Sequence, residues 1–456
     1  MESLNIILRD SVCRRLLNYL SNGRCFSYHV SQSLKIEDAP SRDPQERIMV
    51  AFESPEDSDI PHNWPTLARM VAGFNVMLLN FSFYAASAIF TPSILGIQEE
   101  FQATTAEGTL GLSLFVIAYG IGPLILSPLS SLPTLGRSPV YVLGSLAFCL
   151  LNIGTALAKN IQTVLILRFL GGFVGSAPIS VGGASLMEIY KPNEVPYAIA
   201  MYAVSGVCGP ILGPILGTLA IKRWKTWTAT LWLLSGITAF TTVSTLFFLP
   251  ETLASNILLR RAKRLRAQTG NPAYQSETEM EPSENLAARI VKDIGNDLKL
   301  ACLDPVILFV NLHTMLVYGV LYLWFEFFPF VFDGIYHFTP IQQGLAFFGI
   351  LVGAAVSVVA YVLWLYVSYQ PRVADSILNY LGESYPRHVA SVFAGNTFFR
   401  SSFGGALPLA APRMLNSLGI GWASSVLGFI SVAMMPLPFI LHRYGKRLRS
   451  WSQFAN

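Results

Sequence analysis

Two charged residues stand inside stretches of the sequence that are otherwise free of charge. Arg168 lies about eight residues into the run 160–187, and Glu326 lies in the aromatic part of the run 305–332. A charge at the centre of a bilayer costs roughly 2.5–3.5 kcal/mol on insertion scales, so such residues usually face a cavity or a partner. Poorly solvated surroundings favour the neutral form of a carboxyl, so Glu326 could load and release a proton.

Plainer interpretations of these polar residues stay open. Arg168 could extend to a membrane interface or bond backbone carbonyls. Only six residues separate Glu326 from Asp333, so Glu326 could instead lie at a helix end near the outer surface. Asn80 and Asn311 lie in two of the uncharged runs, where each could line a polar pathway or bond a neighbouring helix.

A group of glycines and prolines marks the run 195–221. Glycines let helices approach closely, and prolines free carbonyls and permit a bend. This run is therefore the predicted place for a hinge between helices that move against each other. The hinge candidates are Gly209, Pro210, Gly213 and Pro214.

The elements that hold these residues are uncharged runs of membrane length. A helix rises about 1.5 Å per residue, so roughly 20 residues cross a hydrocarbon core of about 30 Å. Charged residues make up 13% of the chain, against a usual share of about 25%. We predict an all-α membrane protein with two helical bundles and ten spanning helices. The runs are 70–98, 108–136, 138–158, 160–187, 195–221 and 226–250, then 305–332, 338–371, 388–412 and 414–442.

The distribution of charge predicts the domain organisation. Lys and Arg concentrate in both tails and in the linker, which the positive-inside rule places in the cytoplasm. Lys222, Arg223 and Lys225, in a predicted outer loop, weaken this orientation. Residues 1–20 could form an amphipathic helix on the membrane. The predicted parts are a mostly disordered cytoplasmic tail (1–66), a six-helix bundle (67–250), a charged cytoplasmic linker (251–304), an incomplete bundle of four helices (305–442) and a cytoplasmic tail (443–456).

No pattern of enzyme chemistry is present in the sequence. There is no Walker loop, no HExxH, no GxSxG and no paired His/Asp cluster, so we expect no catalytic residue, no metal and no cofactor. The basic stretch 260–266 lies between two membrane bundles, and we interpret it as a surface helix against anionic lipid rather than a nucleic-acid site. The five cysteines have no zinc spacing or disulfide framework.

A short internal repeat locates a gap in the second bundle. The sequence Glu188-Ile189-Tyr190 follows four apolar runs, whereas Glu383-Ser384-Tyr385 follows only two. If the halves are repeats, the second lacks its third helix and all or most of its fourth, and 372–381 is a remnant. Small residues at 404–406 would then lack a close neighbour.

Several stretches together resemble a fungal major facilitator superfamily transporter of the drug:proton antiporter group, which includes fluconazole-resistance and polyamine exporters. The resemblance runs from about residue 60 to the end, except near 370–376. It is carried by Asn63-Trp64-Pro65, Ser127-Pro128-Leu129-Ser130 with Gly136-Arg137, Arg168-Phe169-Leu170-Gly171-Gly172, Gly209-Pro210 with Gly213-Pro214, Leu249-Pro250-Glu251-Thr252, Leu308 to Pro329, and Val392-Phe393-Ala394-Gly395-Asn396 with Arg400.

The resemblance implies a function and roles for particular residues. The fold would be the two-bundle fold of this superfamily, here with about ten of the usual twelve helices because the ninth and most of the tenth are missing. The implied activity is proton-coupled efflux of drugs, polyamines or a secondary metabolite by alternating access. The implied location is the cell membrane, or alternatively the vacuolar membrane, with the protein as a monomer in lipid and no nucleic-acid partner. A truncated, non-transporting membrane protein or scaffold is the alternative.

The implied roles fall on residues already singled out. Arg168, Glu326, Asn80 and Asn311 would lie on the substrate and proton pathway. Arg137 and Glu188 would form a cytoplasmic gate. The family usually has an acidic residue where this chain has Ser131, which puts one gate contact in doubt. A restored segment of about 60 residues, enough for two spanning helices with their loops, would complete the second bundle.

Overall fold

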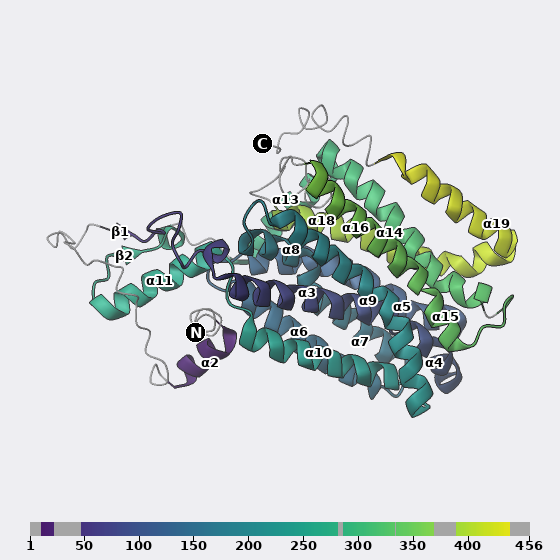
Figure 1. Ribbon diagram of the computed structural model, residues 1–456. Helices are drawn as coiled ribbons and strands as arrows, with labels where there is room; N and C mark the ends of the chain where they lie inside the picture. The colour runs from purple at the N-terminus through teal and green to yellow at the C-terminus, as the bar shows by residue number, and fades with distance from the viewer. Residues whose placement is uncertain (1–10, 22–46, 281–285, 333, 369–388, 438–456) are drawn as a thin grey trace.

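The computed structural model of the protein describes residues 11–21, 47–280, 286–332, 334–368 and 389–437. These residues are almost entirely helical (Figure 1). The one sheet among them is a parallel pair of two-residue strands, β1 (Ile48–Met49) and β2 (Tyr274–Gln275). The all-α fold class is confirmed.

The first half forms a helix for each predicted run. Cap residues define several helix starts. Thr104 and Glu107 form a capping box at the start of α5, and the Asn160 side chain accepts from Thr163 at the start of α7. The helices are α3 (Thr66–Ala88), continued through η2 (Thr91–Ser93) by α4 (Ile94–Phe101), α5 (Thr105–Ser130), α6 (Arg137–Ala156), α7 (Ile161–Val174), α8 (Ala177–Ile189), α9 (Val195–Trp224) and α10 (Ala229–Phe248).

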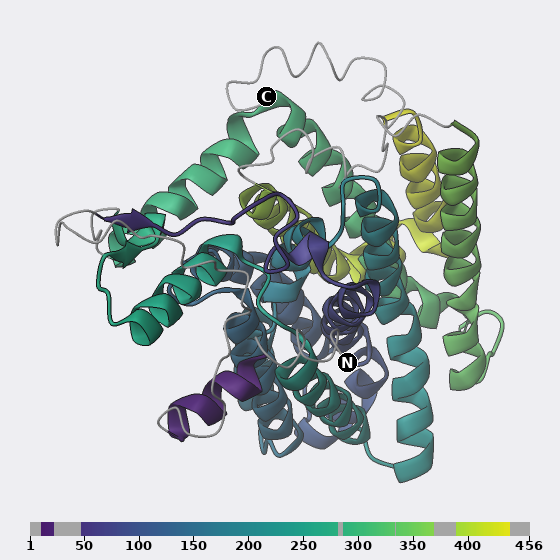
Figure 2. The same cartoon turned by 60° about the vertical axis from the view of Figure 1, so that its left-hand side comes forward.

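The second half contains fewer long helices. Its last helix is interrupted at Gly419, whose φ of 71° is a left-handed conformation that glycine adopts readily. Figure 2 shows α16 and α19 at one edge of the molecule. The elements are α14 (Pro305–Phe332), α15 (Pro340–Ala346), α16 (Phe348–Ser368), α18 (Val389–Ala406), η3 (Leu407–Ala410) and α19 (Ala411–Met434).

Eight helical stretches of the described residues are long and apolar enough to cross a membrane. Six of them lie in the first half and correspond to its six predicted runs. In the second half, Pro305–Phe325 matches one run, and Val389–Met434 joins two runs into one continuous stretch. The remaining run of the second half, 338–371, contains a shorter apolar helix over Gln342–Ser357. The predicted remnant 372–381 and the second copy of the repeat lie outside the described residues.

Several helix pairs join the halves: α5 and α8 pack against α18, and α9 packs against α15 and α16. These contacts correct one expectation, because Gly404 and Gly405 do have close neighbours. A Cβ on Gly404 would lie 2.7 Å from Tyr318 Cδ1, and one on Gly405 would lie 2.9 Å from the Ser113 carbonyl oxygen. Open small residues lie elsewhere, for example on α16, where a Cβ on Gly349 or Gly353 would meet no atom within 4 Å.

The segments outside the spans gather at one end of the bundle (Figure 1). Parts of the N-terminal segment that we expected to be mostly disordered are ordered there: Arg261 of the linker forms ion pairs with Glu53 and Asp57, and β1 pairs with β2. Hydrogen bonds from Arg266 lower the pKa of Glu279 to about 2. The remaining elements here are α2 (Val12–Leu20), η1 (Pro61–Asn63), α11 (Ala254–Thr269), α12 (Glu277–Met280) and α13 (Leu286–Leu303).

Candidate functional site

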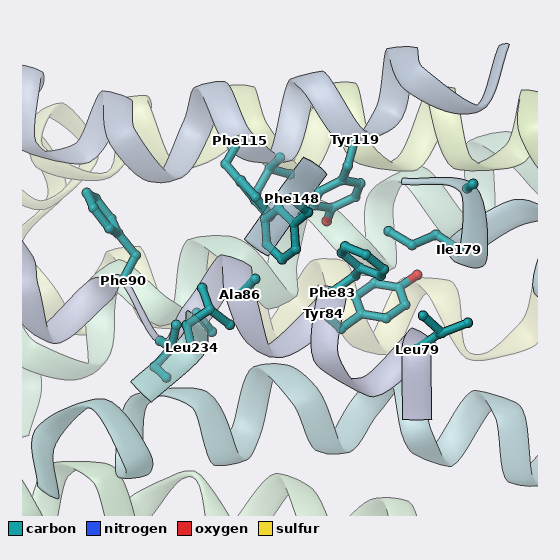
Figure 3. Close-up of a cluster of buried hydrophobic side chains, with 14 of the residues drawn as sticks. Leu79, Phe83, Tyr84, Ala86, Phe90, Phe115, Tyr119, Phe148, Ile179 and Leu234 are labelled. Atoms are coloured by element: carbon teal, nitrogen blue, oxygen red, sulfur yellow. The ribbon is translucent and has the colours of Figure 1, made fainter. Parts of the chain in front are cut away.

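Four tyrosines meet where the two halves of the protein touch, and we call them the tyrosine cluster: Tyr84, Tyr119, Tyr318 and Tyr322. The Tyr119 hydroxyl on α5 lies 2.6 Å from that of Tyr318 and 3.0 Å from that of Tyr322, both on α14. Ser87 of α3 extends this chain of hydroxyls, with its Oγ 2.8 Å from the Tyr322 hydroxyl. Figure 3 shows Tyr84 and Tyr119 approaching each other from α3 and α5. The cluster therefore links both halves through polar tips on aromatic bodies.

Arg400 of α18 lies over this cluster. Its guanidinium carbon is 5.0 Å from the Tyr318 ring centroid and 5.7 Å from that of Tyr84, both within cation–π range. Nη2 donates to the Thr397 hydroxyl at 3.3 Å. The buried Nε atom has no hydrogen-bond partner, and no carboxylate of the described residues pairs with this cation. Arg400 thus places a positive charge with unused N–H donors beside the tyrosine cluster.

Arg168 is a fully buried cation near the cluster. It donates from Nε to the Gly111 carbonyl at 3.2 Å and from Nη1 to the Ala86 carbonyl at 3.1 Å. Its guanidinium carbon lies 4.0 Å from the centroid of Phe115, whose ring is 5.9 Å from that of Tyr119. Arg168 therefore bonds backbone carbonyls, as one interpretation of the sequence allowed, and a single ring separates it from the tyrosine cluster.

The two predicted asparagines lie in different surroundings. Asn80 is one turn before Tyr84 on α3, and its amide donates to the Tyr202 carbonyl at 3.1 Å and to Ser205 Oγ at 2.9 Å. Asn311 instead donates to the Ala301 carbonyl at the end of α13 and accepts from Asn396 at 3.0 Å. Asn80 is thus close to the tyrosine cluster, whereas Asn311 joins the linker to α14 and α18.

The predicted gate residues are in contact at the end of the bundle that carries the linker. Arg137 Nη2 lies 2.8 Å from Glu188 Oε1, and Arg137 Nη1 donates to Ser185. Sequence reasoning missed the role of Glu251, which is fully buried. Its Oε1 accepts from the backbone N–H of Arg137 at 2.9 Å, at the start of α6. Gly136, with φ of +82°, precedes this helix and has no side chain for a cap, so a carboxylate from distant sequence takes that role.

Ser131, at the position of the missing acid, lies apart from this ion pair. Its hydroxyl donates to the Ser127 carbonyl at 3.1 Å. Arg260 approaches Glu251 at 3.3 Å, so a buried carboxylate and the linker are joined to the same network. Arg137, at the start of α6, therefore contacts two carboxylates of the described residues, Glu188 and Glu251, although position 131 is not acidic.

The predicted hinge lies in a continuous helix. α9 runs unbroken through Pro210 and Pro214. Its glycines face α3 closely: a Cβ on Gly209 would lie 2.7 Å from the backbone nitrogen of Ala85, and one on Gly213 would lie 2.9 Å from that of Ile89. The glycines thus permit close helix contact, and the hinge stays a prediction.

Glu326 lies in α14, four residues after Tyr322, and its side chain is outside the described part of the chain. The tyrosine cluster itself was missed at the level of sequence. One signal could have located it: Arg400 interrupts the run 388–412 as Arg168 interrupts its own run. No group of three metal-binding side chains occurs among the described residues.

Comparisons with known proteins agree with this architecture. The family model described as Major Facilitator Superfamily matches residues 76–374. The chain is 38% identical to "Transporter mfs1" of Schizosaccharomyces pombe, over 90% of this chain and 88% of that protein. It is 33% identical to "Multidrug transporter FLR1" of Candida glabrata, over 92% and 86%. It is also 33% identical to "Fluconazole resistance protein 1" of Saccharomyces cerevisiae, over 89% and 85%.

The fold matches a solved structure, that of the proton:xylose symporter XylE, with a TM-score of 0.54 and 13% identity. This match covers 84% of this chain and 96% of that chain. The alignment to the fission-yeast relative extends over 471 positions, although 90% of the 456 residues is only about 410. At about 60 positions of the alignment, the relative therefore has a residue and this chain has a gap. A segment of that length could hold two spanning helices with their loops.

Proposed function

The chain belongs to the Major Facilitator Superfamily of membrane transporters, and on that premise we propose that it exports small organic molecules in exchange for protons by alternating access. The observation that carries the proposal is the tyrosine cluster with Arg400, which brings α3 and α5 of one half together with α14 and α18 of the other. Drugs of the kinds that appear in the relatives' names are the proposed substrates. The proposed setting is a monomer in the cell membrane.

Alternating access follows from how the halves meet. The pairs α5–α18 and α9–α16 are the contacts along which two rigid halves would rock. A substrate held at the tyrosine cluster would then face one side of the membrane at a time. We propose that the Arg137–Glu188 pair controls the cytoplasmic end and that the Gly209–Pro214 segment absorbs the bending.

Proton coupling needs a group that changes charge during this cycle. We propose Glu326 for this role, because it follows Tyr322 by four residues in an aromatic part of α14. Neutralisation of a poorly solvated carboxyl by a proton would favour one orientation of the halves, and release of the proton would favour the other.

Export assays in yeast lacking its own drug exporters test the function. Cells that express the chain should accumulate less fluconazole, and collapse of the proton gradient should remove the difference. Glu326→Gln should abolish this pH-driven export with surface expression intact, and Tyr119→Phe should reduce it. Tyr336→Phe, at a tyrosine that is 60% exposed, is the control and should behave as the parent. Export that persists without a proton gradient would contradict the proposal.

A second candidate is a membrane protein of the same fold that does not transport. The missing positions in the alignment and the uncovered glycines of α16 favour it. In that case fluconazole accumulation in cells that express the chain would equal accumulation in cells without it, and only a version with the segment restored would export.

A further inference from the structure

We propose that the tyrosine cluster and Arg400 select aromatic molecules that are uncharged or anionic and rich in hydrogen-bond acceptors, and that they disfavour organic cations. The inference rests on the proposed function, because it names the substrate class of the same site. The aromatic content of 12% is compatible with planar, hydrophobic or cationic ligands, so composition alone does not distinguish these substrate classes.

The first observation is the unused hydrogen-bonding capacity of Arg400. A guanidinium has five N–H donors in a fixed fork. The hydrogen bond from Arg400 to Thr397 uses one nitrogen, and the buried Nε has no partner among the described residues. A buried donor without a partner is costly, so a ligand that supplies an acceptor gains the full hydrogen bond.

The second observation is the sign of the charge around the cluster. Arg400 lies on one side of the rings, and Arg168 lies behind Phe115 on another. Neither cation has a carboxylate partner among the described residues. Like charges repel strongly where water is scarce, so a cationic ligand would meet two positive charges that no carboxylate of the described residues compensates.

Tyrosine faces by themselves would attract a cation, and this effect opposes the repulsion. The rings of Tyr84 and Tyr318, however, already have Arg400 over them. The ring centroids of Tyr84 and Tyr119 are 6.2 Å apart in an edge-to-face arrangement, which offers an aromatic ligand further ring contacts. Repulsion should therefore decide against cations, while aromatic ligands remain favoured.

Other polar atoms beside the cluster extend the same preference for polar, uncharged groups. Asn80 Oδ1 and Ser401 Oγ are buried and have no hydrogen-bond partner within the described part of the chain. Asn80 is one turn from Tyr84, and Ser401 follows Arg400 directly. A neutral heteroaromatic molecule with both donors and acceptors could satisfy these atoms, whereas a bulky hydrocarbon cation could not.

Equilibrium binding to the purified full chain in lipid nanodiscs provides the test, because it does not require transport. The probes are radiolabelled fluconazole, a neutral azole with acceptor nitrogens, and tetraphenylphosphonium, an aromatic cation without acceptors. We expect fluconazole to bind at least tenfold more tightly. Arg400→Met should weaken fluconazole at least tenfold and strengthen tetraphenylphosphonium several-fold. Arg400→Lys, which keeps the charge and loses the fork, should weaken fluconazole without improving the cation.

The matched control is Arg413→Met, at an exposed arginine of α19, which should leave both affinities unchanged. If Arg400→Met does not fold, Arg400→Gln, which also removes the charge, gives the same comparison. Tighter binding of the cation by the parent protein, or a probe ratio that the Arg400 variants do not move, would overturn the inference and leave the transport proposal standing. Absence of binding by either probe would count against the proposed function itself.

Discussion

The small residues of the two halves differ in what they contact. In α9 of the first half, the small residues Gly209, Gly213 and Gly217 all face the backbone of α3 or the residues that follow it. In α16 of the second half, Gly349 and Gly353 face no atom within 4 Å, and the neighbouring Val356 is 63% exposed. Small residues on membrane helices usually mark close helix contacts, so α16 carries a contact face that no helix of the described residues covers.

The second half packs extensively against the first. α18 packs along α5, a Cβ on Gly405 would touch Ile117, and the hydroxyls of Tyr318 and Tyr322 meet Tyr119. α16 packs on α9. The site between the halves can therefore be complete even where the second bundle is not. This difference separates two questions: whether the chain binds a ligand, and whether it can change orientation.

Completion of the second bundle should have the largest effect of all the changes considered, because it supplies a partner for the open face of α16. Insertion of the corresponding segment of about 60 residues from the fission-yeast relative, between residues 371 and 388, should cover α16 and raise drug export. If the second candidate function holds, the chain as it stands should insert but export poorly or not at all. Fluconazole accumulation in yeast, normalised to surface expression, measures this. Equal export by both versions would show that four helices suffice.

Loss of the buried carboxylate of Glu251 should destabilise the first half strongly. Glu251→Ala removes the acceptor at the start of α6 and leaves Arg260 without its buried partner. Because the Arg260 side chain is partly exposed, the main cost is the buried N–H of Arg137 left without its acceptor, about 1–3 kcal/mol. The comparison variant in the second half is Asp304→Ala, which removes a helix cap at α14 and should cost about 1 kcal/mol. Thermal unfolding midpoints in detergent compare the two variants. A larger loss of stability from Asp304→Ala than from Glu251→Ala would contradict the structural role of Glu251.

A pair of glycine substitutions tests the packing difference directly. Gly209→Ala places a Cβ 2.7 Å from the backbone nitrogen of Ala85, which cannot move aside easily, and overpacking of this kind costs about 1–3 kcal/mol. Gly353→Ala meets open space and should be neutral or slightly stabilising. Both are read from thermal midpoints of the purified proteins. A large loss from Gly353→Ala would show that α16 has a partner in the membrane.

The smallest expected effect concerns pH and the linker helix α13. Burial raises the pKa of Asp297 from 3.8 to about 6, so the folded protein holds a proton that the unfolded chain releases between these values. Stability from this group is therefore greatest at low pH and falls as pH rises toward 6. Asp297→Asn should raise stability by about 1 kcal/mol at pH 7.5, below the limit of about 3 kcal/mol set by that pKa.

The control for this prediction is Glu99→Gln, at an exposed carboxylate of α4. It should shift the midpoint little at either pH. The gain from Asp297→Asn should shrink at pH 5, where the native carboxyl is already mostly neutral. A gain that stays constant from pH 5 to pH 7.5 would mean that Asp297 does not titrate in this range.

The sequence by itself determined the class of the protein and most of its helices. Uncharged runs of about 20 residues are a local property, and lipid requires each one to satisfy its own backbone as a helix. The charged linker, the six-helix first half and the family resemblance therefore followed from the order of residues. The contact of Arg137 with Glu188 was also within reach, because both lie at run ends on the same predicted side.

Only the tertiary structure decided which of the interior polar residues meet. Tyr84, Tyr119 and Tyr318 lie far apart in sequence, and no periodicity within one helix specifies which face of another it will contact. Arg400 and Arg168 look alike as single charges in apolar runs, yet one lies over tyrosines between the halves and the other bonds carbonyls inside the first half. Hydropathy is a property of each segment, whereas a binding site depends on the rotation and packing of several helices together.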